Sequence, residues 1–271
     1  MSINTTEVFS QTDVSGNPWK NDTKMKNIMN QGILILIIGV LFAVMRSFGN
    51  NTKSEIKAKK SNDEINHTEI DSAVSFGYKT VWLAVKTDNK KRISEILKLK
   101  NTKECNWKVG ITESYNSSIY ITPQINDWTL VCGISLLNGN NDKENIIYIK
   151  KTIETLSAEF GEAQFFGSHR VVEYQSWMKA INGKIVRAYC YLGESGENLI
   201  VEGEPTDFEK KYKLINTLSK EAQNDKYFER EDLFYPDEEF VMKVAEDWSI
   251  NPQTLEERKD VKNELGIIGN K

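Results

Sequence analysis

The chain has 271 residues, enough for one large domain or two small ones. Its net charge of −4 and pI near 5.5 argue against a nucleic-acid-binding protein, which usually carries a basic excess. Three scattered cysteines, Cys105, Cys132 and Cys190, lack the spacing of a metal site or a disulfide framework. One disulfide is possible, but we interpret the cysteines as small core residues.

The first recognisable element is an apolar segment. Residues 32–45, "GILILIIGVLFAVM", carry no charge, and they predict a single transmembrane anchor over residues 27–46. A cleaved signal peptide is the alternative, although the segment lacks a clear cleavage site. Residues 1–26 are expected to be a disordered tail and residues 47–72 a flexible, polar tether. The Lys and Arg balance slightly favours a cytoplasmic position for the chain beyond the anchor, and a signal-anchor insertion would reverse it.

From residue 73 the pattern becomes that of a globular domain, extending to residue 271. Residues 78–87 predict a strand, and Asp88 can cap a helix after it. Three strands are then expected in "NWKVGITE", "SSIYITP" and "DWTLVCGISLL", with Pro123 ending the second. A longer helix begins near Asn141 or Asp142 and ends at Gly161, because its apolar residues share one helical face.

The second half of the domain predicts more strands, from "AQFFGSHR" to "NLIVEGEP". Thr206 and Glu209 match a capping box that would start a helix. Pro236 fits the first turn of another helix, and Asn251-Pro252 the start of a short one. This mixture predicts an α+β fold with a largely antiparallel sheet and packed helices, and its two strand–helix–strand halves could be a diverged duplication.

The clearest local signal is a hairpin around Asn182-Gly183, because both central residues of a type I′ turn need positive φ. If no residue is inserted, paired residue numbers sum to 365, so Trp177 shares a core face with Cys190. The other face then carries Tyr174, Arg187, Tyr189 and Tyr191. That face could be a sheet surface covered by the C-terminal helices, or a recognition platform for a partner, with the acidic residues Glu194 and Glu197 beside it.

Signals of catalysis are weak. "GESGE" departs from the nucleophile-elbow pattern at its last position, so it is better interpreted as a turn. His169 is the only histidine of the predicted domain and is a minority candidate for a general base. The carboxylates after this turn lack the spacing of a calcium loop, and we expect neither a metal nor a cofactor.

Several motifs resemble those of a group of uncharacterised bacterial proteins. They are Trp107-Lys108-Val109-Gly110, "WTLV" (128–131), "FGEAQFF" with "HR" (160–170), and "RAYCYLGESGE" followed by "EGEPT" (187–206). The resemblance covers more than half of the domain. Proteins of this group are in turn loosely similar to small α+β binding proteins such as the immunity partners of bacterial toxins.

Together these features predict a single-pass, membrane-anchored, non-enzymatic domain that binds an unknown protein partner and no nucleic acid, with immunity-like binding as one form. The first alternative is a hydrolase that uses His169 and nearby carboxylates as acid and base. The second is a structural component of the cell envelope.

Overall fold

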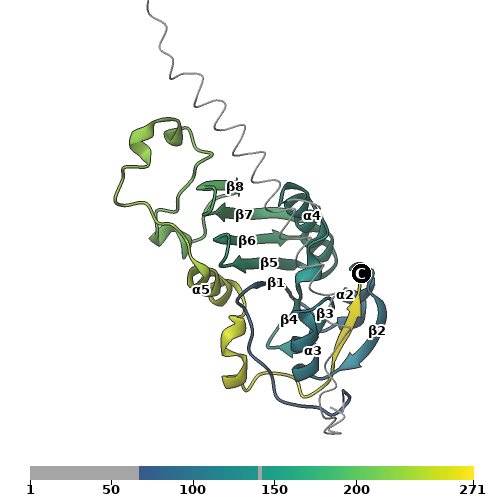
Figure 1. Cartoon of the computed structure of the whole chain (residues 1–271). Helices are drawn as coiled ribbons and strands as arrows, with labels where there is room; N and C mark the ends of the chain where they lie inside the picture. The colour runs from purple at the N-terminus through teal and green to yellow at the C-terminus, as the bar shows by residue number, and fades with distance from the viewer. Residues whose placement is uncertain (1–66, 140–141) are drawn as a thin grey trace, which may run out of the picture. The chain divides into compact units, whose positions relative to one another are not determined.

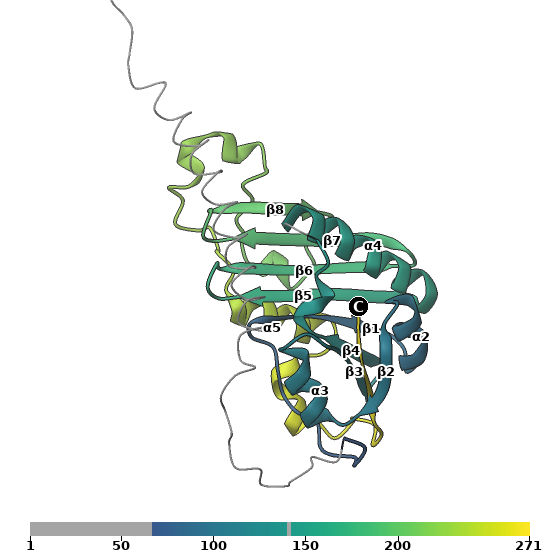
Figure 2. The same ribbon diagram turned by 45° about the vertical axis from the view of Figure 1, so that its right-hand side comes forward.

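The structure, a computed structural model, describes residues 67–139 and 142–271. These residues form an α+β fold built on one open sheet of nine strands, in the order β2-β9-β3-β4-β1-β5-β6-β7-β8 (Figures 1 and 2). Every neighbouring pair of strands is antiparallel, as the sequence predicts. The predicted tail, the predicted anchor at 27–46 and most of the predicted tether lie outside the described residues.

The strands follow the chain in order. They are β1 (Thr80–Val85), β2 (Lys100–Cys105), β3 (Ile119–Ile125), β4 (Trp128–Cys132), β5 (Glu162–His169), β6 (Tyr174–Ile181), β7 (Lys184–Leu192), β8 (Glu197–Glu202) and β9 (Gly266–Asn270). The α-helices are α2 (Lys90–Ile96), α3 (Trp107–Ser114), α4 (Asp142–Phe160) and α5 (Glu238–Trp248). Five 3-10 turns complete the described secondary structure, among them η2 (Glu209–Lys211) and η5 (Pro252–Glu257).

Each face of the sheet has its own apolar core. On one face α3, α5 and η5 cover a cluster rich in aromatic rings, with Trp82, Trp177 and Phe240 at its centre. On the other face α2 and α4 cover a mainly aliphatic cluster, to which α4 contributes residues with helical spacing, including Ile149 and Ile153. Both faces are buried, so most strands are apolar on both sides.

Helix α3 corrects the sequence analysis, which predicted a strand at "NWKVGITE". The Asn106 side chain accepts a hydrogen bond from the backbone N–H of Val109 at 3.2 Å. Asp71, distant in sequence, accepts from the backbone N–H groups of Trp107 and Lys108 at 2.7 and 2.9 Å. These bonds satisfy the free N–H groups of the first turn, so capping overrides the β preference of Trp, Val and Ile.

Other elements also differ from the sequence prediction. Strands β2 and β9 were not expected, because β2 is polar along most of its length and β9 contains two glycines. Pro123 does not end its strand but lies inside β3, where the pairing with β4 shifts register between Ile121 and Gln124. The missing proline N–H is tolerated at such an irregularity. Asn89, one residue after the expected Asp88, caps α2.

The β6–β7 hairpin has the expected turn and a different register. Asn182 and Gly183 both have positive φ, as a type I′ turn needs. Ile181 pairs with Lys184 and Ala180 with Ile185, but Lys179 pairs with Arg187. Val186 is therefore an extra residue, a β-bulge, and every later residue of β7 changes face.

The bulge moves the aromatic residues of β7. Trp177 now pairs with Tyr189 and Gln175 with Tyr191, whereas Met178 pairs with Ala188 and Ser176 with Cys190. Arg187, Tyr189 and Tyr191 thus share the face of Trp177, and the predicted division of the hairpin faces is wrong. One inserted residue reverses every subsequent side chain because the side-chain period of a strand is two.

A glycine lets the chain leave β8 next to this bulge. Gly203 has a φ of +75°, and a Cβ atom placed on it would lie 2.0 Å from the carbonyl oxygen of Val186. Only a glycine therefore fits where the chain after β8 passes the bulge. Gly196, in the turn before β8, also has positive φ, but a Cβ there would meet no atom within 4 Å.

This difference gives a matched test. Gly196→Ala should lower the free energy of unfolding by about 1–2 kcal/mol, the usual cost of the left-handed conformation. Gly203→Ala should cost clearly more, because it adds a steric clash with backbone to the same strain. Urea unfolding of the two full-length variants measures both values. Equal destabilisation would show that the approach of Gly203 to Val186 is not a constraint.

Candidate functional site

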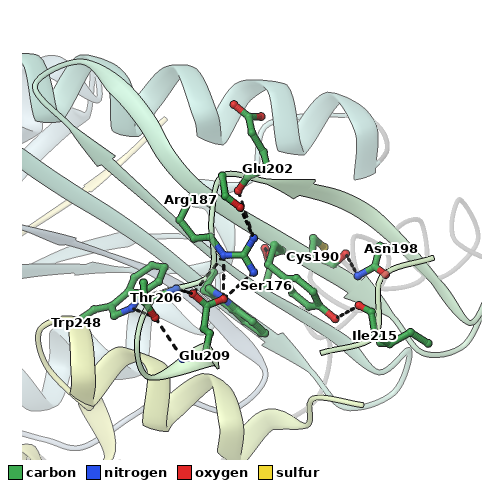
Figure 3. Close-up of polar contacts among 12 residues, drawn as sticks. Ser176, Arg187, Cys190, Asn198, Glu202, Thr206, Glu209, Ile215 and Trp248 are labelled. Atoms are coloured by element: carbon green, nitrogen blue, oxygen red, sulfur yellow. Dashed lines mark hydrogen bonds and ion pairs between the residues drawn. The ribbon is translucent and has the colours of Figure 1, made fainter. Parts of the chain in front are cut away.

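The most concentrated set of polar contacts lies on the aromatic face, around Arg187 and Glu209 (Figure 3). Arg187 donates from Nε and from Nη2 to Glu209 Oε1, at 2.9 and 2.7 Å. Its Nη1 donates to the carbonyl oxygens of Glu202 and Gly203 at 3.3 and 3.2 Å. The two side chains are only 3% and 0% exposed, so this ion pair is fully withdrawn from solvent.

Glu209 receives two further hydrogen bonds. Trp177 Nε1 donates to Oε1 at 2.8 Å, and the backbone N–H of Thr206 donates to Oε2 at 2.8 Å. The backbone N–H of Glu209 in turn donates to Thr206 Oγ1 at 3.4 Å. The reciprocal bonds of the predicted capping box are therefore present, but they begin the single 3-10 turn η2 in place of a longer helix.

Tyr189 continues the same buried layer. Its ring stacks on Trp177, with ring centroids 4.4 Å apart and an angle of 16° between the planes. Its hydroxyl donates to the carbonyl oxygen of Ile215 at 2.8 Å. The segment after β8 is thus held on the sheet by Glu209 and Ile215, and also by Thr217, whose backbone N–H donates to Asn198 Oδ1 at 2.8 Å.

The remaining residues of the predicted platform do not form one surface. Tyr191 is buried and meets the ring of Tyr235 edge-on. Tyr174 lies on the opposite face, beside the aliphatic cluster. Glu194, in the turn before β8, and Glu197, the first residue of β8, are both exposed. The structure therefore brings Arg187, Tyr189 and Tyr191 together as a covered layer, the first of the two interpretations of this face, and leaves the two glutamates in solvent.

Glu209 is the residue that sequence reasoning missed. The sequence analysis gave Glu209 only a role in a capping box, whereas its carboxylate is also the counter-charge of Arg187. A signal was available, because an arginine inside an apolar strand needs a buried anion, and the capping box fixes the position of Glu209. All these bonds satisfy the carboxylate internally, so the arrangement stabilises the fold and offers no group to a substrate.

The ion pair should dominate the stability of this region. Glu209→Gln or Arg187→Met leaves one buried charge without its partner, and each should lower the free energy of unfolding by roughly 3–5 kcal/mol. The exposed pair of Arg92 with Glu159, 2.9 Å apart, is the control, and Glu159→Gln should cost far less, because water screens the pair. Chemical denaturation of the full-length variants gives these values.

Replacing both partners extends this test. Arg187→Met combined with Glu209→Leu removes both charges, so the double variant should recover part of the stability that either single variant loses. A single variant that costs no more than Glu159→Gln would contradict the role assigned to the pair.

His169 ends β5 and is partly buried. Burial, together with the positive charge of Lys79, lowers the pKa of its imidazole. Within residues 67–139 and 142–271 no carboxylate lies within ion-pair distance of His169. The adjacent Arg170 binds Glu238 of α5 and lies 5.7 Å from the ring centre of Tyr78. The acid–base pair of the hydrolase alternative is thus not assembled around this histidine.

The lowered pKa predicts a pH effect on stability. An unfolded histidine takes up a proton near pH 6.5, and folded His169 does so only at lower pH, so the folded state loses stability as pH falls through about 6.5. His169→Asn should therefore lose less free energy of unfolding than wild type between about pH 7.5 and about pH 5. Urea unfolding at both values measures the loss, and the exposed His67→Asn is the control. An equal loss in His169→Asn and wild type would contradict the prediction.

The three cysteines are buried and unpaired, as core residues are. Burial raises the pKa of Cys105 to about 11 and those of Cys132 and Cys190 to about 12. Such thiols remain protonated and unreactive at neutral pH. In the described part of the chain, no group of three or more His, Cys, Asp or Glu residues could hold a metal ion.

Two small hollows lie on the surface. One, of about 310 Å³, is lined by residues that include Tyr78, Tyr115 and Gln253. The other, of about 340 Å³, is lined by residues that include Asp71 and Arg258. Neither contains His169 or the Arg187–Glu209 pair, so the buried polar groups of the fold do not open into either one.

Comparisons with known proteins add no assignment. A scan against protein-family models, a search of curated proteins and a search of solved structures each find no match to this chain. The resemblance to a group of uncharacterised bacterial proteins therefore stays a prediction. Between residue 67 and the C-terminus, leaving aside 140–141, no helix has the length and apolar character needed to cross a membrane.

Proposed function

We propose that this chain is a membrane-anchored, non-enzymatic protein that binds a protein partner at the β8 edge of its sheet. The observation that carries the proposal is the pair of exposed residues Glu194 and Glu197 at the start of β8, an edge strand with no neighbour beyond it in the described part of the chain. In the sequence-based hypothesis the binding surface included Arg187 and Tyr189, and their burial shifts the proposed surface to Glu194, Glu197 and β8.

The position of this edge supports the proposal. The described chain begins beside α3, where the backbone N–H of Asn106 donates to the carbonyl oxygen of His67 and where Asp71 caps the helix. Helix α3 packs on β3 and β9, in the half of the sheet that ends at β2, whereas β8 is the opposite edge (Figure 1). The first described residues therefore lie in the other half of the sheet and leave β8 uncovered.

The segment after η2 adds exposed apolar surface in the same half. It extends beyond the strand ends next to β8 in both ribbon views (Figures 1 and 2). Leu218, Phe228 and Tyr235 on this segment are 60%, 46% and 47% exposed. Isolated exposed apolar residues are common, but three of them on one segment are compatible with a protein contact.

The hydrolase alternative has less support. His169 lacks a carboxylate partner, the Glu209 carboxylate is enclosed by four hydrogen-bond donors, and the cysteine thiols are buried. No observation specifically favours a cell-envelope component, and the experiment below separates it from a binding protein.

The proposal is tested by affinity capture of the full-length protein from its native membrane. We expect a defined protein partner with the wild-type chain and little or none with Glu194→Lys/Glu197→Lys, because the charge reversal opposes a basic surface. The control is Glu246→Lys/Asp247→Lys, which makes the same charge change on the exposed face of α5 and should leave recovery unchanged.

Three results would overturn the proposal. Recovery of no partner removes the binding function, and recovery only within a large envelope assembly favours the structural alternative. Wild-type protein that stays in the aqueous fraction after gentle lysis removes the membrane anchor. Substrate turnover that disappears in His169→Ala would establish the hydrolase instead.

A further inference from the structure

The two edges of the sheet differ in how they are protected against pairing with another strand. At one edge, β2 exposes Lys100 and Lys103, and its pairing with β9 is interrupted between these residues. Asn101, between them, has a φ of +52°. Charged lysines and irregular backbone are the usual means by which proteins block an exposed edge. Strand β2 is therefore a poor template for a further strand.

At the other edge, β8 is only partly blocked. The backbone N–H of Asn198 donates to Thr217 Oγ1 at 2.7 Å, which closes the first part of the strand. The apolar residues Leu199, Ile200 and Val201 come next and are half-buried. Leu199 is an inserted residue, because Asn198 pairs with Tyr191 and Ile200 with Cys190, so the regular ladder resumes at Ile200. Within the described residues, their backbone groups have no hydrogen-bond partner outside β7. A short open edge thus begins after the bulge at Leu199, with Ile200 and Val201 in regular pairing to β7.

Acidic side chains lie at both ends of this open edge. Glu194 and Glu197 precede it, are exposed, and take part in no ion pair within the described part of the chain. Glu202 and Glu204 lie after it and are also exposed, with Glu202 paired to Lys150. The edge therefore combines an apolar centre with negative charge on both sides.

This charge pattern selects among possible occupants. If two copies of the chain paired antiparallel through β8, Glu197 of one copy would lie near Glu202 of the other, and like charges opposite each other destabilise a sheet. Pairing of β8 with β2 of another copy would place the lysines of β2 near the glutamates of β8. However, the polar residues Asn101 and Thr102 would then lie opposite the apolar centre of β8, and the backbone of β2 is irregular there. Both forms of self-association are disfavoured.

We infer that β8 accepts, by strand addition, an extended segment of another protein with β-branched or aromatic residues at its centre and Lys or Arg at its ends. Main-chain hydrogen bonds to the outward-facing backbone groups of Leu199, Ile200 and Val201 would supply affinity, and the glutamates would select the flanking cations. This inference rests on the proposed binding function and specifies the chemistry of the partner.

The test uses the full-length protein in detergent and a phage library of random peptides of about nine residues, long enough to run along β8 and its flanks. We expect enriched peptides with Val, Ile, Thr or Phe between Lys or Arg residues. A synthesised peptide of this kind should slow hydrogen exchange of the amides of residues 199–202. Its affinity should fall at least about tenfold in Glu194→Lys/Glu197→Lys and stay unchanged in Glu246→Lys/Asp247→Lys.

Several results would refute strand addition. These are failure to enrich any peptide, enrichment of acidic or proline-rich peptides, protection confined to other segments such as residues 216–230, or concentration-dependent self-association through β8. The two proposals can fail separately. If a protein captured from the membrane binds the chain and leaves amide exchange in β8 unchanged, the binding function stands and strand addition is rejected. If a peptide binds at β8 but no protein is captured from the membrane, strand addition stands and the proposed binding of a membrane-derived protein partner is rejected.

Discussion

The buried ion pair of Arg187 with Glu209 is the interaction on which one half of this fold depends. A guanidinium buried beneath a loop is tolerated only if an anion and further acceptors replace water, and the carboxylate and two carbonyl oxygens do so here. Three local features bring the partners together. The bulge at Val186 turns Arg187 to the aromatic face, Gly203 lets the chain pass the bulge, and the capping box directs Glu209 inwards.

Sequence patterns identified much of this architecture, because periodicity and turn chemistry are local. The face of α4, the Asn182-Gly183 turn and the antiparallel character of the sheet were all predictable on these grounds. Helix α3 was not, since its first turn is capped by Asp71, thirty-six residues before Trp107. Strands β2 and β9 were missed because the pairing of two segments far apart in sequence, and not an apolar alternation, defines them.

Only part of the predicted residue set lies together, and its surroundings differ from the prediction. Arg187, Tyr189 and Tyr191 do form a group, but a single inserted residue decides which face they occupy, and no residue type marks that insertion in the sequence. The aromatic richness that suggested a recognition platform instead provides rings for a buried stack with Trp177. The surface that remains open is defined by what lies beyond β8, which is a property of the whole sheet and cannot be read from one hairpin.

The enclosed thiols have a consequence for where such a domain can function. Cys105, Cys132 and Cys190 are all unpaired within the two cores, so folding requires no oxidant, and the raised pKa values keep the sulfur atoms from reacting with disulfide reagents in the medium. The folded domain therefore needs no disulfide, and its buried thiols are poorly placed for exchange with glutathione.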